Sequence, residues 1–243
     1  MSIKRENLIK VGTIEVLVWR KQVKNLHLNV LPPDGKVRVT APLNFSEDAI
    51  RTFVATKLSW IKKHQKTFQN QPRQTPREYV SGESHYFLGR RYILEVLEQD
   101  EKPRVYIKGK QRIILVCRPG SDREKRKDIL LRWYRKHLSF ILEKLVSKWE
   151  KELGVQARSW RVQRMKTKWG SCNPIKRTMT FNLELAKWSE NCIEYVVLHE
   201  LLHLIERKHN ERFRQLLDKN MPLWRRYKDQ LNQEVVLADF FDR

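Results

Sequence analysis

The sequence predicts an α+β protein, because a strand-rich N-terminal part precedes a longer helical part. Up to about residue 120 the apolar residues often alternate with polar ones, which is typical of strands with one buried face. From Ser121 onward they recur every three or four residues, as on one face of a helix. We expect a β-rich N-terminal region over residues 1–120 and a mainly helical region with a small antiparallel sheet over residues 121–243. Whether these form two independent domains stays open, because the earlier strands can also pack directly on the helical part.

The N-terminal region begins with three strand-like runs followed by a helix. The runs cover residues 13–20, 26–30 and 36–40. A Pro-Pro-Asp-Gly turn at residues 32–35 joins the last two, which predicts an antiparallel hairpin or meander. Residues 46–65 are expected to be helical, because Ser46 is a good N-cap residue and the apolar positions behind it have helical spacing.

A polar stretch at residues 69–77 contains two prolines and predicts a linker or long loop. Four further strand-like runs follow, at residues 86–88, 92–97, 104–107 and 113–117. Turn residues separate these runs from one another.

Beyond residue 120 a long helix is expected to residue 153, opened by a capping box of Ser121 and Glu124 and closed by Gly154. The remaining expected elements are two short strands at 160–164 and 178–183, a helix beginning near Ser189, and a last helix over about 210–231.

The charge of the chain favours an anionic or acidic partner. Its 243 residues include 50 Lys and Arg against 28 Asp and Glu, a formal net charge of +22. Residues 101–168 alone hold 21 Lys and Arg and 7 Asp and Glu. One hypothesis is nucleic-acid contact through this stretch; the other is a solvated long helix with basic strands beside it.

The sequence carries no pattern typical of a membrane or secreted protein. The longest apolar runs are four to five residues, such as 195–198, whereas a spanning helix needs about 20. The start, MSIKREN, has no apolar stretch behind it. Three widely spaced cysteines do not suggest a disulfide framework. We therefore expect a cytoplasmic protein without membrane contact.

Three of the seven histidines fall within the segment YVVLHELLHLIERKHN. His199 and His203 are four residues apart, so on a helix both rings lie on one face and can reach one metal ion. Glu200 lies about 100° around that helix, beside the ion, where it can accept a proton from water. The alternative is a pair of partly buried histidines with a solvated Glu200. The apolar run ahead of the motif favours a buried active-site helix.

A catalytic zinc site needs a third protein ligand. On a straight helix His209 would lie roughly 240° around from His203 and face away from it. The helix must therefore stop, and we expect the stop within residues 206–208, with Asn210 tolerating a left-handed turn.

Carboxylates from the last helix, Glu211 or Asp218, are the rival third ligands. Cys172 is a weaker candidate, because no paired Cys-x-x-Cys supports it.

These residues together resemble the YgjP-like zinc metallopeptidase family, a relative of the SprT-like and other HExxH proteins. The resemblance is dense over about residues 160–230. It rests on the Trp-Gly-Ser-Cys run at 169–172, a strand ending in Asn182, the motif helix at 195–203, and His209-Asn210 with Phe213.

The resemblance implies that residues 121–243 form a zincin-like catalytic domain with one zinc ion. Its ligands would be His199, His203 and His209, with Glu200 as general base. The sequence departs from the family at Lys168, where an arginine is frequent. Lysine keeps the positive charge, but it cannot make the planar bidentate contact that arginine makes.

The run around residue 170 is expected to form the rim of a substrate cleft. Gly170 permits close backbone approach and Trp169 offers a flat wall. An edge strand around residues 181–183 would hold an extended peptide by main-chain pairing. The alternative is a structural turn with Trp169 in the core. The expected substrate contacts are Lys168, Trp169, Gly170, Ser171 and Asn182.

The leading functional hypothesis is a zinc-dependent metallopeptidase that cleaves peptides or proteins. A second keeps the metal site but acts on nucleoside triphosphates, since a basic cleft suits phosphates and the resemblance extends to members described as nucleotide pyrophosphatases. A third is a nucleic-acid-associated protein with a structural zinc site, and a protease acting on DNA-bound proteins combines the two.

Overall fold

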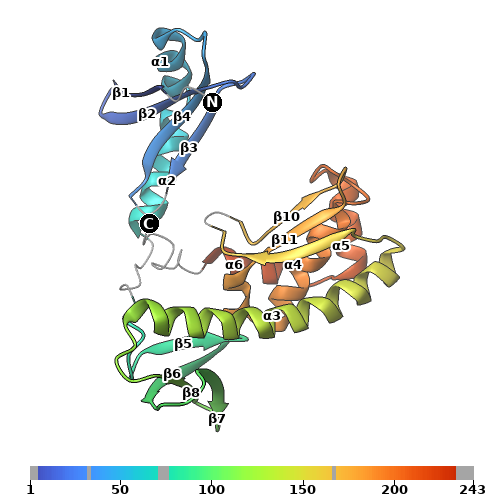
Figure 1. Ribbon diagram of the computed structural model, residues 1–243. Coiled ribbons are helices and arrows are strands. Elements are labelled where there is room, and N and C mark those ends of the chain that lie inside the picture. The colour runs from blue at the N-terminus through green and yellow to red at the C-terminus, as the bar shows by residue number, and fades with distance from the viewer. Residues whose placement is uncertain (1–4, 32–33, 71–76, 166–167, 234–243) are drawn as a thin grey trace. The chain divides into compact units, whose positions relative to one another are not determined.

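The computed structural model confirms the α+β class (Figure 1). It describes residues 5–31, 34–70, 77–165 and 168–233. The chain divides into two compact units, Met1–Pro76 with Val235–Arg243, and Arg77–Glu234. Each unit has its own hydrophobic core. The HExxH segment lies wholly within the second unit.

The first unit is a four-stranded sheet with two helices. The strand order is β1-β2-β4-β3, with β2 and β4 parallel and the other neighbours antiparallel. Its elements are β1 (Arg5–Val11), β2 (Ile14–Lys21), β3 (His27–Leu31), β4 (Lys36–Pro42), α1 (Glu47–Ala55) and α2 (Leu58–Asn70). Alternate valines of the central strands pack against Ile50, Val54 and Ile61 of the helices, which explains the period-two pattern of this region.

Three features of this unit differ from expectation. The strand β1 was not anticipated, and it pairs with β2 across a tight turn at Gly12. The strands do not form a simple meander, because β2 pairs with β4 and not with β3. The helix expected over 46–65 is two helices: Ser46 caps the first as expected, but the Thr56 hydroxyl donates to Phe53 O at 2.8 Å where α1 ends. Residues 71–76 of the expected linker lie outside the described residues.

The second unit begins with a second four-stranded sheet in the order β5-β6-β8-β7. Its strands are β5 (Ser84–Phe87), β6 (Arg90–Glu98), β7 (Arg104–Lys108) and β8 (Arg112–Cys117). All four correspond to runs expected from the sequence. Every residue of β8 after Arg112 is buried, as expected for a central strand.

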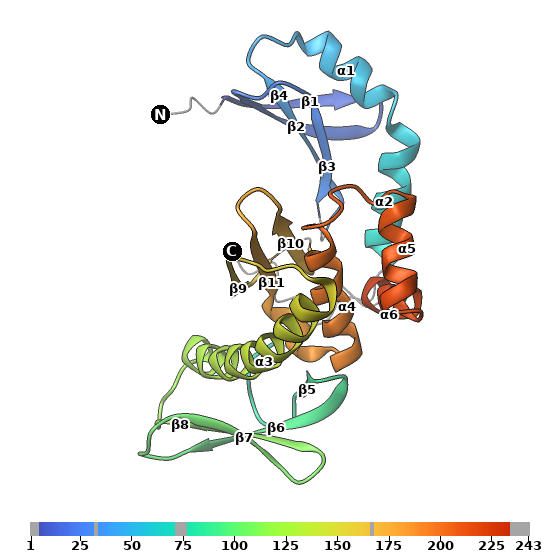
Figure 2. The same cartoon turned by 90° about the vertical axis from the view of Figure 1, so that its right-hand side faces the viewer.

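The long helix α3 (Arg123–Leu153) is the axis of the second unit. Asp122, not Ser121, is its N-cap: the Asp122 carboxylate accepts from Lys125 N at 2.8 Å, while the Ser121 hydroxyl donates to Arg118 O. Gly154 ends the helix in the left-handed conformation, as expected. Figures 1 and 2 show the β5–β8 sheet on one side of α3 and the later elements of the same unit on the other.

The boundary expected at residue 120 falls inside this unit, because the β5–β8 sheet shares its core with the helical part. The Phe87 and Trp133 ring centroids are 4.5 Å apart, and Tyr134 Oη donates to Tyr86 O at 2.8 Å. Beyond α3, Leu88 N donates to Ala186 O at 3.0 Å. The division between the two units instead follows Pro76.

The rest of the unit is a three-stranded sheet and a set of short helices. The sheet order is β10-β11-β9, with β11 antiparallel to β10 and parallel to β9. The elements are β9 (Ser159–Gln163), β10 (Gly170–Asn173), β11 (Thr178–Asn182), the 3₁₀ helix η1 (Leu183–Lys187), α4 (Glu190–Leu202), α5 (Glu211–Asn220) and α6 (Trp224–Gln233).

Two expectations for this part are corrected. The edge strand expected around residues 181–183 is the central strand β11 and the start of η1, so the edge nearer α4 is β10. The helix expected over 210–231 is interrupted at Met221, because Pro222 disfavours a helical conformation in the residue before it. No helix in the described part of the chain has the length and apolar run that a bilayer crossing needs.

Candidate active site

The helix α4 places the first two histidines. Ser189 caps it by accepting from Cys192 N, and the sequence predicts that a helix begins near this residue. Its apolar residues run all round the helix, because α4 packs against α3, α6 and β10 at once. His199 and His203 lie one turn apart at its C-terminal end, with His203 as the C-cap.

The chain turns directly after α4, and this turn places His209 close to His199 and His203. The helix ends at Leu202, earlier than the stop expected at 206–208. Glu206 N still donates to Leu202 O at 2.8 Å, which closes the turn. Asn210 does not adopt a left-handed conformation; its side chain accepts from Phe213 N and caps α5. His209 therefore lies between the turn and a new helix.

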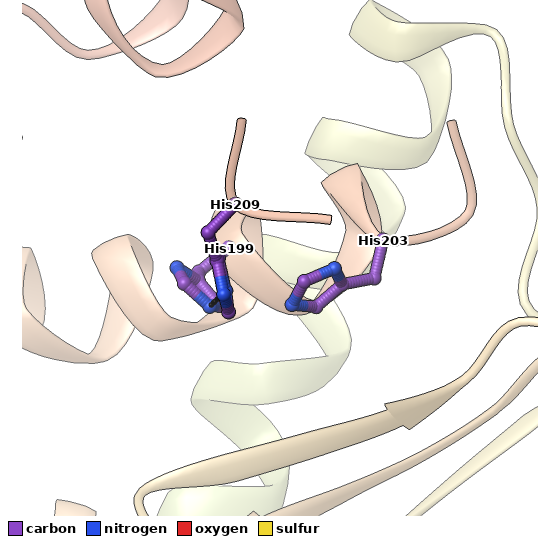
Figure 3. Close-up of side chains that lie close together, drawn as sticks. All are labelled: His199, His203 and His209. Atoms are coloured by element: carbon purple, nitrogen blue, oxygen red, sulfur yellow. Dashed lines mark hydrogen bonds between the residues drawn. The ribbon is translucent and has the colours of Figure 1, made fainter. Parts of the chain in front are cut away.

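The three imidazole rings converge (Figure 3). One ligand atom from each of His199, His203 and His209 lies within 4.8 Å of the others. The Nε2 atoms of His199 and His209 are 3.0 Å apart. Nitrogens of a tetrahedral zinc site with bonds of about 2.0–2.1 Å would lie about 3.3 Å apart. This spacing fits a single ion after a small adjustment.

The surroundings fix the orientation of the rings. His203 Nδ1 lies 3.2 Å from Glu206 O, so an Nδ1–H donated there leaves Nε2 free for a metal. The buried Phe213 packs its ring against all three histidines, with centroids 4.9–5.0 Å away. Phe213 is held by α5, whose capping residue directly follows His209.

His199 and His203 are in the protonation state that metal binding requires. Burial lowers the pKa of His199 to about 3, assisted by His203, His209 and Lys228. Burial also lowers the pKa of His203. At neutral pH the rings of His199 and His203 are therefore uncharged and can present lone pairs to a cation.

The carboxylate of Glu200 lies beside this cluster on the same helix and is buried, with 6% exposure. Burial raises its pKa to about 8, and nearby Lys168 acts in the opposite direction. A divalent cation beside it would lower this value. A carboxylate with a pKa near the working pH is suited to general acid–base catalysis.

Gly170 makes room for this carboxylate. A Cβ atom at residue 170 would lie 2.5 Å from Glu200 Oε1 and 2.7 Å from Glu200 Cγ. The close approach expected of Gly170 is therefore made to the catalytic candidate itself.

The rival ligands lie elsewhere. Asp218 accepts from Trp224 Nε1 and pairs with Arg225, and Glu211 is largely exposed and pairs with Arg214. Burial, then Glu200, raises the pKa of the Cys172 thiol to about 11, which keeps it protonated. Among the described residues, the metal-ligand grouping consists of the three histidines.

The expected substrate-contact residues divide into two groups. Lys168, Trp169 and Gly170 line a cavity that also includes His199 and Glu200. Ser171 does not line it and pairs with Thr180 across the β10–β11 ladder.

Asn182 is 2% exposed and holds the preceding loop in place. Its Nδ2 donates to Met165 O at 2.9 Å and to Lys168 O at 2.8 Å, and its Oδ1 accepts from Glu184 N. Its hydrogen bonds in the described structure are with the chain itself, and it does not line the cavity.

The same cavity includes residues that sequence analysis missed. Lys228, Leu231 and Asn232 reach it from α6. Their spacing marks one face of a helix, but only the packing of α6 on α4 shows that this face is turned to the site.

The sequence matches the family described as YgjP-like, metallopeptidase domain, over residues 24–234. This chain belongs to the YgjP-like family. This match confirms the resemblance that the short motifs indicated. The YgjP-like family is a metallopeptidase family, and such families hydrolyse peptides with a bound metal.

Two solved structures are similar to part of the YgjP-like chain. One is the crystal structure of the metallopeptidase zymogen of Pyrococcus abyssi abylysin, with 22% identity, a TM-score of 0.35, and coverage of 37% of this chain and 90% of that one. The other is the zymogen of Methanocaldococcus jannaschii jannalysin, with 19% identity, a TM-score of 0.35, and coverage of 38% and 88%. No curated protein has a significant match to the sequence.

Proposed function

We propose that the chain is a zinc-dependent peptidase in which His199, His203 and His209 hold one zinc ion and Glu200 is the general base. The observation that carries the proposal is the convergence of three imidazoles beside a buried carboxylate. Three imidazoles with an open fourth position are typical of catalytic zinc sites, whereas structural sites have four protein ligands.

A zinc ion held by these three histidines would lower the pKa of a bound water molecule and polarise a substrate carbonyl. Glu200 accepts the proton from the attacking water and delivers it to the leaving nitrogen. The His203–Glu206 contact keeps one ligand ring in the required tautomer. Phe213 excludes water from the rear of the rings.

The strand β10 is suited to hold an extended substrate. It pairs with β11 on one side and is the last strand of its sheet on the other. Its first residue, Gly170, lies against Glu200. A peptide that pairs with this edge by β-augmentation would pass beside the general base.

The test is hydrolysis by zinc-loaded protein, with casein and a peptide library assayed beside nucleoside triphosphates. We expect peptide cleavage that a chelator abolishes and added zinc restores. Phosphate release without peptide cleavage would instead establish the nucleotide alternative. DNA binding that is salt-sensitive and unaffected by Glu200→Gln, with neither hydrolytic activity, would establish the non-enzymatic alternative.

Nucleic-acid contact through residues 101–168 remains a prediction. Several cations in this stretch are paired within the unit, among them Arg104 with Glu101, Arg112 with Glu95 and Lys148 with Glu194. Binding measured from low to moderate salt tests the remaining exposed cations, and no affinity at low salt would exclude a DNA-bound protease.

A further inference from the structure

The cavity beside the histidine cluster is large enough for a substrate side chain. Its volume is about 230 Å³, and its walls come from α4, α6 and the start of β10. Because His199 and Glu200 are part of its lining, a group bound there lies next to the residues assigned to catalysis.

Two lysines line this cavity from different elements. Lys168 precedes β10 and Lys228 lies on α6. In the part of the chain that the structure describes, neither ammonium group has an acidic partner. Both act on the site electrostatically, because Lys168 lowers the pKa of Glu200 and Lys228 lowers that of His199.

Both lysines contact buried residues, Lys168 through its backbone and Lys228 through its side chain. The carbonyl of Lys168 accepts from the buried Asn182 at 2.8 Å. The ammonium of Lys228 lies 5.6 Å from the centroid of the Trp224 ring, and that ring stacks on Tyr195 with centroids 6.2 Å apart. The first contact fixes the backbone of Lys168, and the second restricts the side chain of Lys228, which then loses less entropy on binding a ligand than a freely rotating one does.

The rest of the lining is largely apolar. Trp169, Tyr195, Val196 and Leu231 contribute aromatic or aliphatic surface. Glu200 is the single acidic group in this lining, as far as the described residues show. A ligand with a short apolar stem and an anionic end matches both the walls and the charge.

We propose that this cavity binds a carboxylate of the peptide substrate through Lys168 and Lys228, so that the enzyme selects substrates with an acidic group beside the cleaved bond. The proposal rests on the proposed peptidase function and names its substrate class. The carboxylate comes either from an Asp or Glu side chain or from the C-terminus of a short peptide, and the two sources share the same chemistry.

The test begins with a peptide library digested by the zinc-loaded protein and analysed by mass spectrometry. A cleaved sequence is then made in three forms: a Glu form with both ends blocked, the matching Gln form with both ends blocked, and the Gln form with a free C-terminus. In the wild-type protein we expect kcat/KM for one of the two acidic forms to exceed that of the blocked Gln form by about fivefold or more. Which acidic form is favoured identifies the source of the carboxylate.

The variants Lys228→Met and Lys228→Glu, with the corresponding Lys168 variants, then test the assignment. The Met variants should reduce the preference for the acidic form, and the Glu variants should abolish or invert it, because charge reversal replaces attraction with repulsion. Lys136→Glu is the matched control: Lys136 is exposed on α3, outside the cavity, and gives the same change in net charge. It should leave the preference unchanged.

A binding measurement separates selectivity from turnover. Zinc-loaded Glu200→Gln protein should bind the favoured acidic peptide more tightly than the blocked Gln form, and Lys228→Glu should remove this difference. Equal cleavage of all three peptides by the wild type, or a preference unchanged in both lysine variants, overturns the carboxylate site while the peptidase function stands. If the library is not cleaved at all, the proposed function fails and the selectivity fails with it.

Discussion

The α-carbon of Gly170 faces the carboxylate of Glu200 so closely that no side chain fits between them. A Cβ atom would lie 2.5 Å from Oε1 and 2.9 Å from Cδ of Glu200. One steric contact therefore couples the position of Gly170, the first residue of β10, to that of Glu200, the proposed general base. The position of the β10 edge and that of the proposed base cannot vary independently.

Substitution of Gly170 by alanine should reduce activity more than stability. The added methyl group displaces Glu200, and an error of about 1 Å in a catalytic group costs on the order of 100-fold in rate. The measurement is kcat/KM together with thermal unfolding. In a Glu200→Asp background, where the carboxylate is one methylene shorter, the further loss from Gly170→Ala should be smaller. Equal losses in both backgrounds would show that the contact does not control catalysis.

Glu200→Gln should keep zinc but lose turnover. The amide has nearly the same shape, so the histidine cluster is undisturbed, but it cannot accept the proton. General-base catalysis typically contributes about 10²–10⁴-fold. Zinc content by elemental analysis and kcat on a cleaved peptide check the two halves of the prediction. Near-normal turnover would exclude Glu200 as the base.

His209→Ala should weaken zinc binding by more than about 100-fold, since removal of even an outer-sphere partner costs 10–100-fold. Glu211→Ala should leave zinc affinity unchanged, because this side chain is 72% exposed and pairs with Arg214. Titration of the metal-free proteins with zinc against a competing chelator gives the comparison. If Glu211→Ala loses zinc and His209→Ala does not, the assignment of the third ligand is reversed.

The buried His85 should make stability pH-dependent. Burial, with help from Arg77 and Lys187, lowers its pKa from 6.5 to about 2, although Glu83 Oε2 lies 3.2 Å from its Nε2 and acts in the opposite direction. Burial prevails here because the ring is 1% exposed and the Glu83 carboxylate also accepts from Tyr79 N. The folded ring therefore stays neutral where the unfolded one is protonated.

This contribution to stability is complete above pH 6.5 and is lost progressively as the pH falls from 6.5 toward 2. One proton taken up on unfolding changes the free energy of unfolding by at most about 1.4 kcal/mol per pH unit. Urea unfolding of wild type and His85→Gln between about pH 4.5 and 7.5 isolates the effect, because other titrating groups cancel in the difference. A difference that does not vary with pH would contradict the prediction.

The motif helix was predictable because its signals are local. Ser189 caps it, an apolar run precedes the histidines, and the four-residue spacing sets the shared face. The strands with clear alternation were predictable for the same reason. The expectation that His209 joins the cluster came from the family resemblance, since helical geometry alone places it on the far side.

The features that were missed depend on tertiary structure or on competition between neighbours. Asp122 competes with Ser121 as the helix cap, and the serine hydroxyl bonds back to Arg118 O instead. The strand β10 is too short to show a period, and it exists because Gly170 to Asn173 pair with β11. Lys228 lies 25 residues beyond His203, the end of the motif, and only the packing of α6 brings it to the cavity.

The helix α3 buries side chains on two opposite sides, toward the β5–β8 sheet and toward α4. Without α3, the apolar side chains of the β5–β8 sheet and of α4 that face it would be uncovered. The second unit should thus melt in one cooperative step, and a protein cut at residue 120 would leave each fragment with an uncovered apolar face. The change in sequence pattern at that point marks a change of architecture and not a place where the chain can be divided.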